Sequence, residues 1–165
     1  MYNYEKNTIE IKKTFHPFKP IFDENSKILI LGSFPSVKSR AVNFYYGHPG
    51  NRFWKVISSL TGSSIVPQTA EEKKKLLLDN KIALWDVIKS CEIKGSSDTS
   101  IKNVTINDIQ GLIFKSNIKK LYANGNLAYS LYNKYCFNKI GIDIIKLPST
   151  SPANAGLSLD KLVSL

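Results

Sequence analysis

Four short apolar runs most constrain what this chain can fold into. They lie at residues 27–31, 81–87, 118–123 and 142–147 and read KILIL, KIALWDV, IKKLYA and IDIIKL. Near-continuous hydrophobicity over so few residues is typical of parallel strands that are covered on both faces, because a strand with one wet face alternates apolar and polar residues. The sequence therefore predicts a buried sheet of four strands.

Segments of helical character separate these runs. Apolar residues recur at helical spacing in two of them, 51–60 and 126–135. Thr69 with Glu72 forms a capping box ahead of EKKKLLLDN, and Thr105 with Asp108 resembles a second box. Strands that alternate with helices, joined by right-handed crossovers, predict an α/β fold: a three-layer αβα sandwich with a central four-stranded, mostly parallel sheet.

The length of 165 residues suits one domain with its own core. We expect residues 27–165 to form this domain, and residues 1–26 to be an N-terminal extension packed on it, with HPFKPIF as an irregular stretch. The first residues, MYNYEKNTIEIKK, hold no apolar signal-peptide core. No stretch approaches the ~18 apolar residues of a membrane span. We therefore expect no membrane partner.

Charge and cysteine content limit the functional class. Lys and Arg number 23 against 13 Asp and Glu, a formal net charge of +10. Such a basic domain favours a polyanionic partner, nucleic acid first, although a solvated basic surface with no partner has the same composition. Cys91 and Cys136 stand far apart and, even with His16 and His48, give no metal-ligand spacing. We expect a cytoplasmic monomer with no metal and no cofactor.

Polar segments follow all four apolar runs: GSFPS, DVIKSCEIKGSSDTS, NGN and PSTSPANAG. Ligands of open α/β sheets bind beyond the carboxyl ends of the strands, so these segments predict a site at one edge of the sheet. GSFPS continues into neither GK[ST] nor GxGxxG, which excludes a Walker loop and a dinucleotide fingerprint. A plain turn stays open for this segment.

The string YYGHPGNRFW at residues 45–54 is the most telling one. Exposed tyrosines stack on nucleobases, at roughly 1–3 kcal/mol per base. Core packing is the alternative for Tyr45 and Tyr46, and a helix N-cap is the alternative for Asn51. His48 reads as a structural hydrogen-bonding group rather than a catalytic base.

These strings together resemble a known family. GSFPSVKSRAVNFYYGHPGNRFWKVI is similar to the first motif of the uracil-DNA glycosylase superfamily, especially its mismatch-specific uracil and hypoxanthine (deoxyinosine) branches. LWDVIKSCEIKGSSDTSI and LPSTSPANA resemble the second and last signatures of the hypoxanthine branch. With YANGN, the resemblance runs from about Phe15 to the C-terminus. Phe34 stands where the mismatch-specific uracil enzymes carry a water-positioning asparagine, and the essential asparagine of the hypoxanthine branch maps onto Asn51.

The resemblance implies a monofunctional DNA glycosylase of base-excision repair. It would hydrolyse the N-glycosidic bond of deaminated bases in double-stranded DNA, with deoxyinosine favoured over uracil. A G/U mismatch-specific uracil-DNA glycosylase and a catalytically inactive DNA-binding module are the alternatives. A metal-dependent nuclease is a third class, for which the sequence offers no clustered carboxylates.

The same resemblance assigns roles to residues. Asn51 would hold the attacking water by its amide oxygen, and donors around Ser33 would stabilise the departing base. The residues expected to contact the base are Ser33, Phe34, Tyr46, Asp86 and Asn124. Asp86 would accept a ring N–H or, alternatively, cap the following turn, and Asn124 would contact the base or cap a helix. The residues expected to contact DNA are Ser36, Ser149, Thr150, Ser151 and Pro152.

Overall fold

The predicted sheet is present in the computed structural model, which describes residues 10–165. All four strands are parallel and lie in the order β3-β2-β6-β7. Their bounds are Ile28–Gly32 (β2), Ile82–Asp86 (β3), Lys120–Asn124 (β6) and Ile144–Leu147 (β7). Leu29 and Leu31 of β2 point to opposite faces of their strand from Ile30, and all three are buried, so the apolar runs do reflect coverage on both faces.

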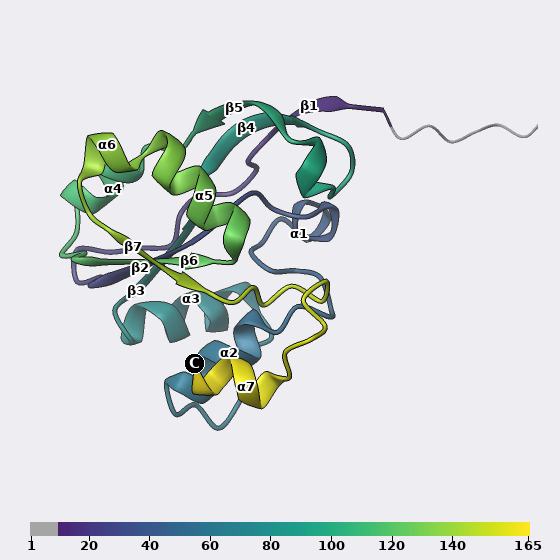
Figure 1. Cartoon of the computed structure of the whole chain (residues 1–165). Helices are drawn as coiled ribbons and strands as arrows, with labels where there is room; N and C mark the ends of the chain where they lie inside the picture. The colour runs from purple at the N-terminus through teal and green to yellow at the C-terminus, as the bar shows by residue number, and fades with distance from the viewer. Residues whose placement is uncertain (1–9) are drawn as a thin grey trace, which may run out of the picture.

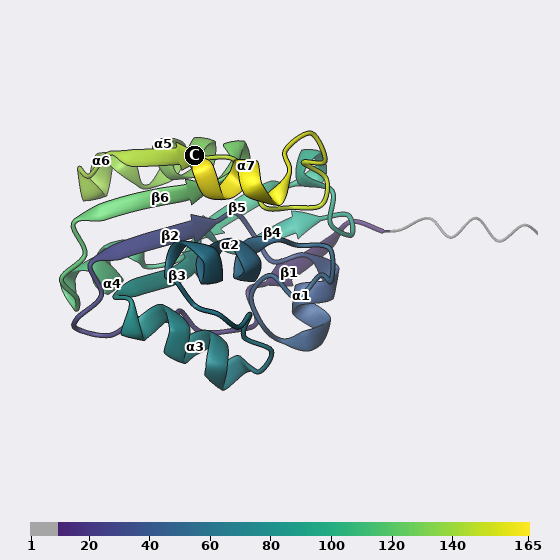
Figure 2. The same ribbon diagram turned by 90° about the horizontal axis from the view of Figure 1, so that it is seen from below.

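Helices cover the sheet on both sides and make three layers (Figures 1 and 2). One layer holds α4 (Ile109–Phe114), α5 (Asn126–Tyr135) and α6 (Phe137–Ile140), and the other holds α2 (Phe53–Leu60), α3 (Ala70–Asp79) and α7 (Leu159–Ser164). The short α1 (Val37–Val42) follows β2 at the carboxyl-end edge of the sheet. The α/β sandwich expected from the sequence is confirmed.

Local capping chemistry explains where two of the helices begin. Thr69 Oγ1 accepts the backbone N–H of Glu72, and the Glu72 carboxylate accepts the N–H of Thr69, so α3 has the predicted capping box. The second predicted box is wrong. Asp108 is itself the N-cap of α4 and accepts the N–H of Gly111, whereas Thr105 lies in a strand and bonds the Ser90 hydroxyl.

A second sheet was not predicted. It is antiparallel, in the order β1-β4-β5, with bounds Lys12–Phe15 (β1), Ile88–Ile93 (β4) and Lys102–Ile106 (β5). The segment after β3 was expected to be a polar strand-end loop, but it holds β4. Buried Asn107 makes this possible, because its Nδ2 donates to the carbonyls of Asp86 and Ile88, where the chain leaves one sheet for the other.

The N-terminal segment lies against the domain from residue 10 onward, and residues 1–9 are outside the described part. β1 pairs with β4, and Ile21, which is 5% exposed, exchanges two backbone hydrogen bonds with Leu84. Between these anchors HPFKPIF forms neither helix nor strand apart from the bridge at Ile21. The two anchors bring His16 to the carboxyl end of β3. No helix of the described chain is long and apolar enough to cross a membrane.

Candidate active site

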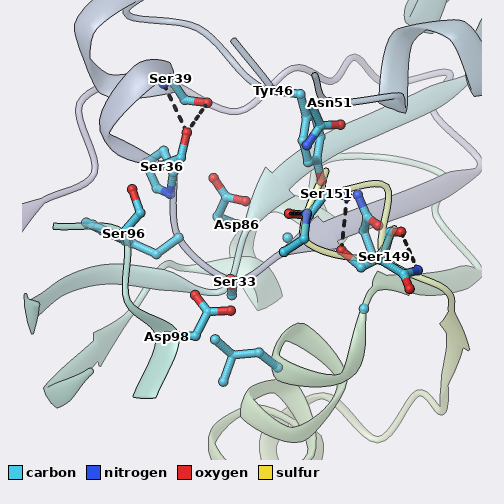
Figure 3. A pocket seen from close by; sticks show the side chains of 18 of the residues that line it. Ser33, Ser36, Ser39, Tyr46, Asn51, Asp86, Ser96, Asp98, Ser149 and Ser151 are labelled. Carbon is cyan, nitrogen blue, oxygen red and sulfur yellow. Dashed lines mark hydrogen bonds between the residues drawn. The ribbon is translucent and has the colours of Figure 1, made fainter. Parts of the chain in front are cut away.

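The carboxyl ends of the parallel strands border a cavity of about 820 Å³ (Figure 3). The segment after β2, Asp86 at the end of β3, Asn124 at the end of β6 and the segment after β7 all line it, as the strand-end argument predicted. Tyr46 and Asn51 reach the same cavity from the loop before α2. The structure therefore places Ser33, Phe34, Tyr46, Asn51, Asp86 and Asn124 around one space.

Asn51 is held by two hydrogen bonds to its amide oxygen. Its Oδ1 accepts the backbone N–H of Phe53 at 2.9 Å and the hydroxyl of Thr150 at 2.9 Å. An amide oxygen has two lone pairs, and both are used here, so the expectation that this oxygen holds a water does not fit. The Nδ2 group makes no hydrogen bond within residues 10–165 and is the group left for a ligand.

Thr150 links Asn51 to Asn124. Asn124 Nδ2 donates to Thr150 Oγ1 at 3.0 Å, and the Thr150 N–H donates to Asn124 Oδ1 at 3.0 Å. Thr150 is 6% exposed and its hydroxyl bonds Asn51 and Asn124 inside the protein, so its contact with DNA stays a prediction. The helix-cap alternative for Asn124 is wrong, because Gly125 is the N-cap of α5. Asn124 instead orients the loop that steadies Asn51.

The two tyrosines have different roles. Tyr45 is 2% exposed and donates its hydroxyl to the Lys19 carbonyl, so core packing describes it. Tyr46 lines the cavity, with one ring face stacked on Phe53 at 4.0 Å between centroids. Its hydroxyl is buried without a hydrogen-bond partner among the described residues. Burial, and then the nearby Asp86 carboxylate, raise the pKa of Tyr46, so the phenol keeps its proton.

Asp86 is the buried carboxylate of the cavity wall, and Figure 3 shows it among Ser33, Ser36 and Tyr46. Its Oδ2 lies 2.7 Å from His16 Nε2, and both side chains are under a tenth exposed. The alternative that Asp86 caps the following turn has no support, since no backbone N–H within residues 10–165 donates to its carboxylate. Oδ1 lies against Gly32 and carries no hydrogen bond in the same range.

Gly32→Ala is expected to lower the free energy of unfolding by roughly 1–3 kcal/mol, the cost of overpacking. The added Cβ would lie 2.2 Å from Asp86 Oδ1 and 3.1 Å from Tyr46 Oη, so the carboxylate must move. Urea unfolding measures the change. Gly156→Ala is the matched control, because its Cβ would meet nothing within 4 Å. Equal stability of the two variants would contradict the close packing of Asp86 on Gly32.

Hydroxyls in the predicted DNA-contacting loops are used locally. Ser36 caps α1 and accepts the N–H of Ser39. Ser149 accepts the N–H of Ser151, and Ser151 accepts the N–H of Ala153, both at 3.2 Å. These bonds shape the loops. Ser36, Ser149 and Ser151 line the cavity, and Pro152 beside Ser151 is exposed. Their contact with DNA stays a prediction.

Sequence reasoning missed two residues. Arg52 donates to the carbonyls of Ser151, Asn154 and Leu157 and so fastens the loop after β7 to the start of α2. Its place next to Asn51 in the GNRFW string was the only signal. His16 was weighed only as a metal ligand, and no local pattern ties it to Asp86, which is 70 residues away. Across residues 10–165 no three His, Cys, Asp or Glu side chains gather as a metal site.

One family model and two related proteins match the sequence of this chain. The sequence model of the uracil DNA glycosylase superfamily matches residues 19–163. A hypoxanthine DNA glycosylase of Methanosarcina acetivorans is 38% identical over 147 residues, which cover 87% of this chain and 90% of that protein. A hypoxanthine DNA glycosylase of Methanosarcina barkeri is 41% identical over 109 residues, which cover 66% of this chain and 69% of that protein.

A solved structure agrees with the sequence matches. The solution NMR structure of a Methanosarcina acetivorans protein named "putative Uracil DNA glycosylase" superposes with a TM-score of 0.76 at 36% identity. The match covers 89% of this chain and 91% of that one. Three findings agree: the family model matches most of the chain, two relatives are more than 30% identical, and the solved structure has the same fold. This chain belongs to the uracil DNA glycosylase superfamily.

Proposed function

We propose that this protein excises hypoxanthine from DNA by hydrolysing the N-glycosidic bond of deoxyinosine. The observation that carries the proposal is one cavity in which an oriented amide (Asn51), an aromatic face (Tyr46) and a buried carboxylate (Asp86) meet at the strand ends. The relatives named hypoxanthine DNA glycosylase support the choice of base.

The reaction breaks the bond between C1′ and N9 of the base. The electron pair of this bond leaves with the base, the sugar gains oxocarbenium character, and a water oxygen bonds to C1′. The water loses a proton, and the departing base gains one. Such a cation needs little nucleophilic push, so placement of the water suffices. Asn51 does not titrate; its Nδ2–H holds the water oxygen, while Thr150 and the Phe53 N–H hold the amide in place.

Hypoxanthine presents a carbonyl, O6, beside a ring N–H at N1. Two polar atoms of the cavity without partners match this edge: Asp86 Oδ1 accepts the N–H, and the Tyr46 hydroxyl, which keeps its proton, donates to O6. Both atoms face Gly32. The ring face of Tyr46 opposite Phe53 is available to stack on the base. Uracil carries the same edge at O4 and N3–H, so it is the competing substrate.

The base must leave the duplex before it enters the cavity. Flipping costs a few kcal/mol and less for a mismatched base, which favours inosine in a mispair. The partner is therefore duplex DNA with a damaged or mismatched base. We infer that the protein acts as a monomer, since residues of one chain line the cavity.

Binding to duplex DNA is expected to weaken steeply as salt rises. The net charge of +10 comes mostly from lysines, and each phosphate that they neutralise contributes a slope of about −0.9 in a log–log plot. Fluorescence anisotropy at several salt concentrations, with a labelled duplex that contains a single inosine, gives this slope. A flat response would show that the positive charge does not contact DNA.

A panel of duplexes carrying inosine, uracil or xanthine tests the function. Release of hypoxanthine, read as strand breaks that appear only after alkali treatment, is the expected result, and borohydride should trap no adduct. Faster release of uracil opposite guanine would favour the mismatch-specific uracil activity. Binding of the duplex without release of any base would identify a DNA-binding module. Loss of release with EDTA, restored by a divalent ion, would indicate metal-dependent chemistry.

A further inference from the structure

His16 reaches the cavity wall from outside the part of the chain that the family model matches. That match begins at residue 19, whereas His16 follows β1 in the N-terminal segment. The side chain is 3% exposed and lies 2.7 Å from Asp86 through Nε2. It packs edge-on against Phe18, with ring centroids 4.6 Å apart, and against Phe34 at 6.3 Å. Buried polar side chains are normally hydrogen-bonded, so the burial of this imidazole among aromatic rings calls for an explanation.

The His16 side chain makes a single hydrogen bond among the described residues. Its Nδ1 is buried and finds no partner within residues 10–165. That hydrogen bond joins Nε2 to Asp86 Oδ2, where the ring N–H donates and the carboxylate oxygen accepts. It fixes the carboxylate so that the second oxygen, Oδ1, faces Gly32 and the cavity.

The acceptor character of Asp86 separates hypoxanthine from adenine. Hypoxanthine carries a proton on N1, which Oδ1 accepts. Adenine carries a lone pair on N1, which faces a carboxylate unfavourably, and its amino group at C6 meets the Tyr46 hydroxyl where hypoxanthine has a carbonyl. Deamination of adenine changes both groups, so an acceptor at Asp86 Oδ1 distinguishes the damaged base from adenine.

We propose that His16 is a positioning residue for base discrimination: its hydrogen bond to Oδ2 holds Asp86 with Oδ1 facing the cavity as an acceptor, and so makes the cavity prefer hypoxanthine over adenine. This inference rests on the proposed function. If His16 is lost, Oδ2 of the buried carboxylate has no hydrogen-bond partner among residues 10–165, and the group is free to turn away from Gly32. The acceptor that matches hypoxanthine N1–H is then no longer fixed toward the cavity, so hypoxanthine loses more affinity than adenine.

The test compares His16→Leu, which removes the donor and keeps an apolar side chain, with His16→Gln, whose amide N–H donates without titrating. Duplexes that carry 2′-fluoro-deoxyinosine or 2′-fluoro-deoxyadenosine, in which the glycosidic bond is stabilised, report base affinity. For His16→Leu, we expect the inosine-over-adenosine affinity ratio and the single-turnover rate on inosine each to fall by about tenfold, which is the scale of one unsatisfied buried group. His16→Gln is expected to stay within about threefold of wild type.

Two further variants separate this role from loss of packing. Ile21→Ala loosens the same segment without touching Asp86, so it should lower the melting temperature and leave the affinity ratio unchanged. Asp86→Asn already removes the charge, so adding His16→Leu to it should have little further effect on the ratio.

The inference is overturned if His16→Leu keeps the wild-type ratio, if His16→Gln is as poor as His16→Leu, or if Ile21→Ala alone shifts the ratio. The proposed function fails separately, since wild-type protein would then release no hypoxanthine. Release of hypoxanthine by wild type together with an unchanged ratio in His16→Leu would refute the role of His16 alone.

Discussion

Asn51→Ala is expected to slow single-turnover release of hypoxanthine by roughly 10²-fold or more, which corresponds to about 2.7 kcal/mol on the barrier. The alanine removes Nδ2, the one polar group of this side chain that has no hydrogen bond among residues 10–165. It also frees the Thr150 hydroxyl and the Phe53 N–H, which both donate to Oδ1. Quench-flow or gel measurement with enzyme in excess over an inosine duplex gives the rate.

Stability separates this role from that of a helix-terminal cap. Loss of the Phe53 bond alone is expected to cost ~1 kcal/mol of unfolding free energy, as at an N-cap. Asn51→Asp is the matched control: it keeps both acceptor bonds and replaces the Nδ2–H donor with an anionic acceptor oxygen. We expect it to melt close to wild type and still be slow. If Asn51→Asp kept the wild-type rate, the water would not be held through Nδ2; if Asn51→Ala did, Asn51 would be structural only.

Arg52→Met is expected to lower the free energy of unfolding by roughly 3 kcal/mol, because several charge-assisted hydrogen bonds are lost at once. Its guanidinium donates to the Ser151 carbonyl at 3.0 Å and to the Asn154 carbonyl at 2.9 Å, and it also reaches the Leu157 carbonyl. For a chain of this length the loss corresponds to a drop of roughly 6–12 °C in melting temperature. The loop that carries Thr150 loses its anchor, so base release should fall as well.

Lys55→Met is the control for Arg52→Met, since it removes the same charge from an exposed position on the same helix. It should change the melting temperature little. Differential scanning calorimetry compares the two. If the Arg52→Met and Lys55→Met proteins had the same melting temperature, the three carbonyl contacts would contribute nothing to stability. Hydrogen exchange at residues 149–157 then reports whether the loop itself is loosened.

The four strands of the parallel sheet could be predicted from the sequence, because strands covered on both faces appear as short, almost continuous apolar runs. The runs at 27–31 and 81–87 differ from β2 and β3 by one residue at each end. The second sheet could not be predicted from the sequence. Its middle strand, β4, has the short and mixed pattern IKSCEI, and the two strands that pair with it, β1 and β5, lie more than 80 residues apart in the chain. Buried Asn107, which holds the chain where the two sheets meet, has no local signature.

The candidate site was also predicted only in part. Strand ends in a parallel sheet meet at one edge, so the sequence alone indicated that Ser33, Asp86 and Asn124 share a cavity. The hydrogen-bond partners of the residues in the cavity could not be predicted from the sequence. The sequence predicts a DNA contact for Thr150, whereas the loop folds inward and places the Thr150 hydroxyl between Asn51 and Asn124.

The sequence by itself determined the four buried strands, the class of fold and the residues that stand at the strand ends, because each of these follows from local hydrophobic pattern and chain direction. The tertiary structure decided which polar groups face one another. Thr150 meets Asn51 across 99 residues and His16 meets Asp86 across 70, and buried polar groups at such separations find partners only once the layers have packed. Hydrogen-bond pairing depends on distance in space, and no local pattern encodes that distance.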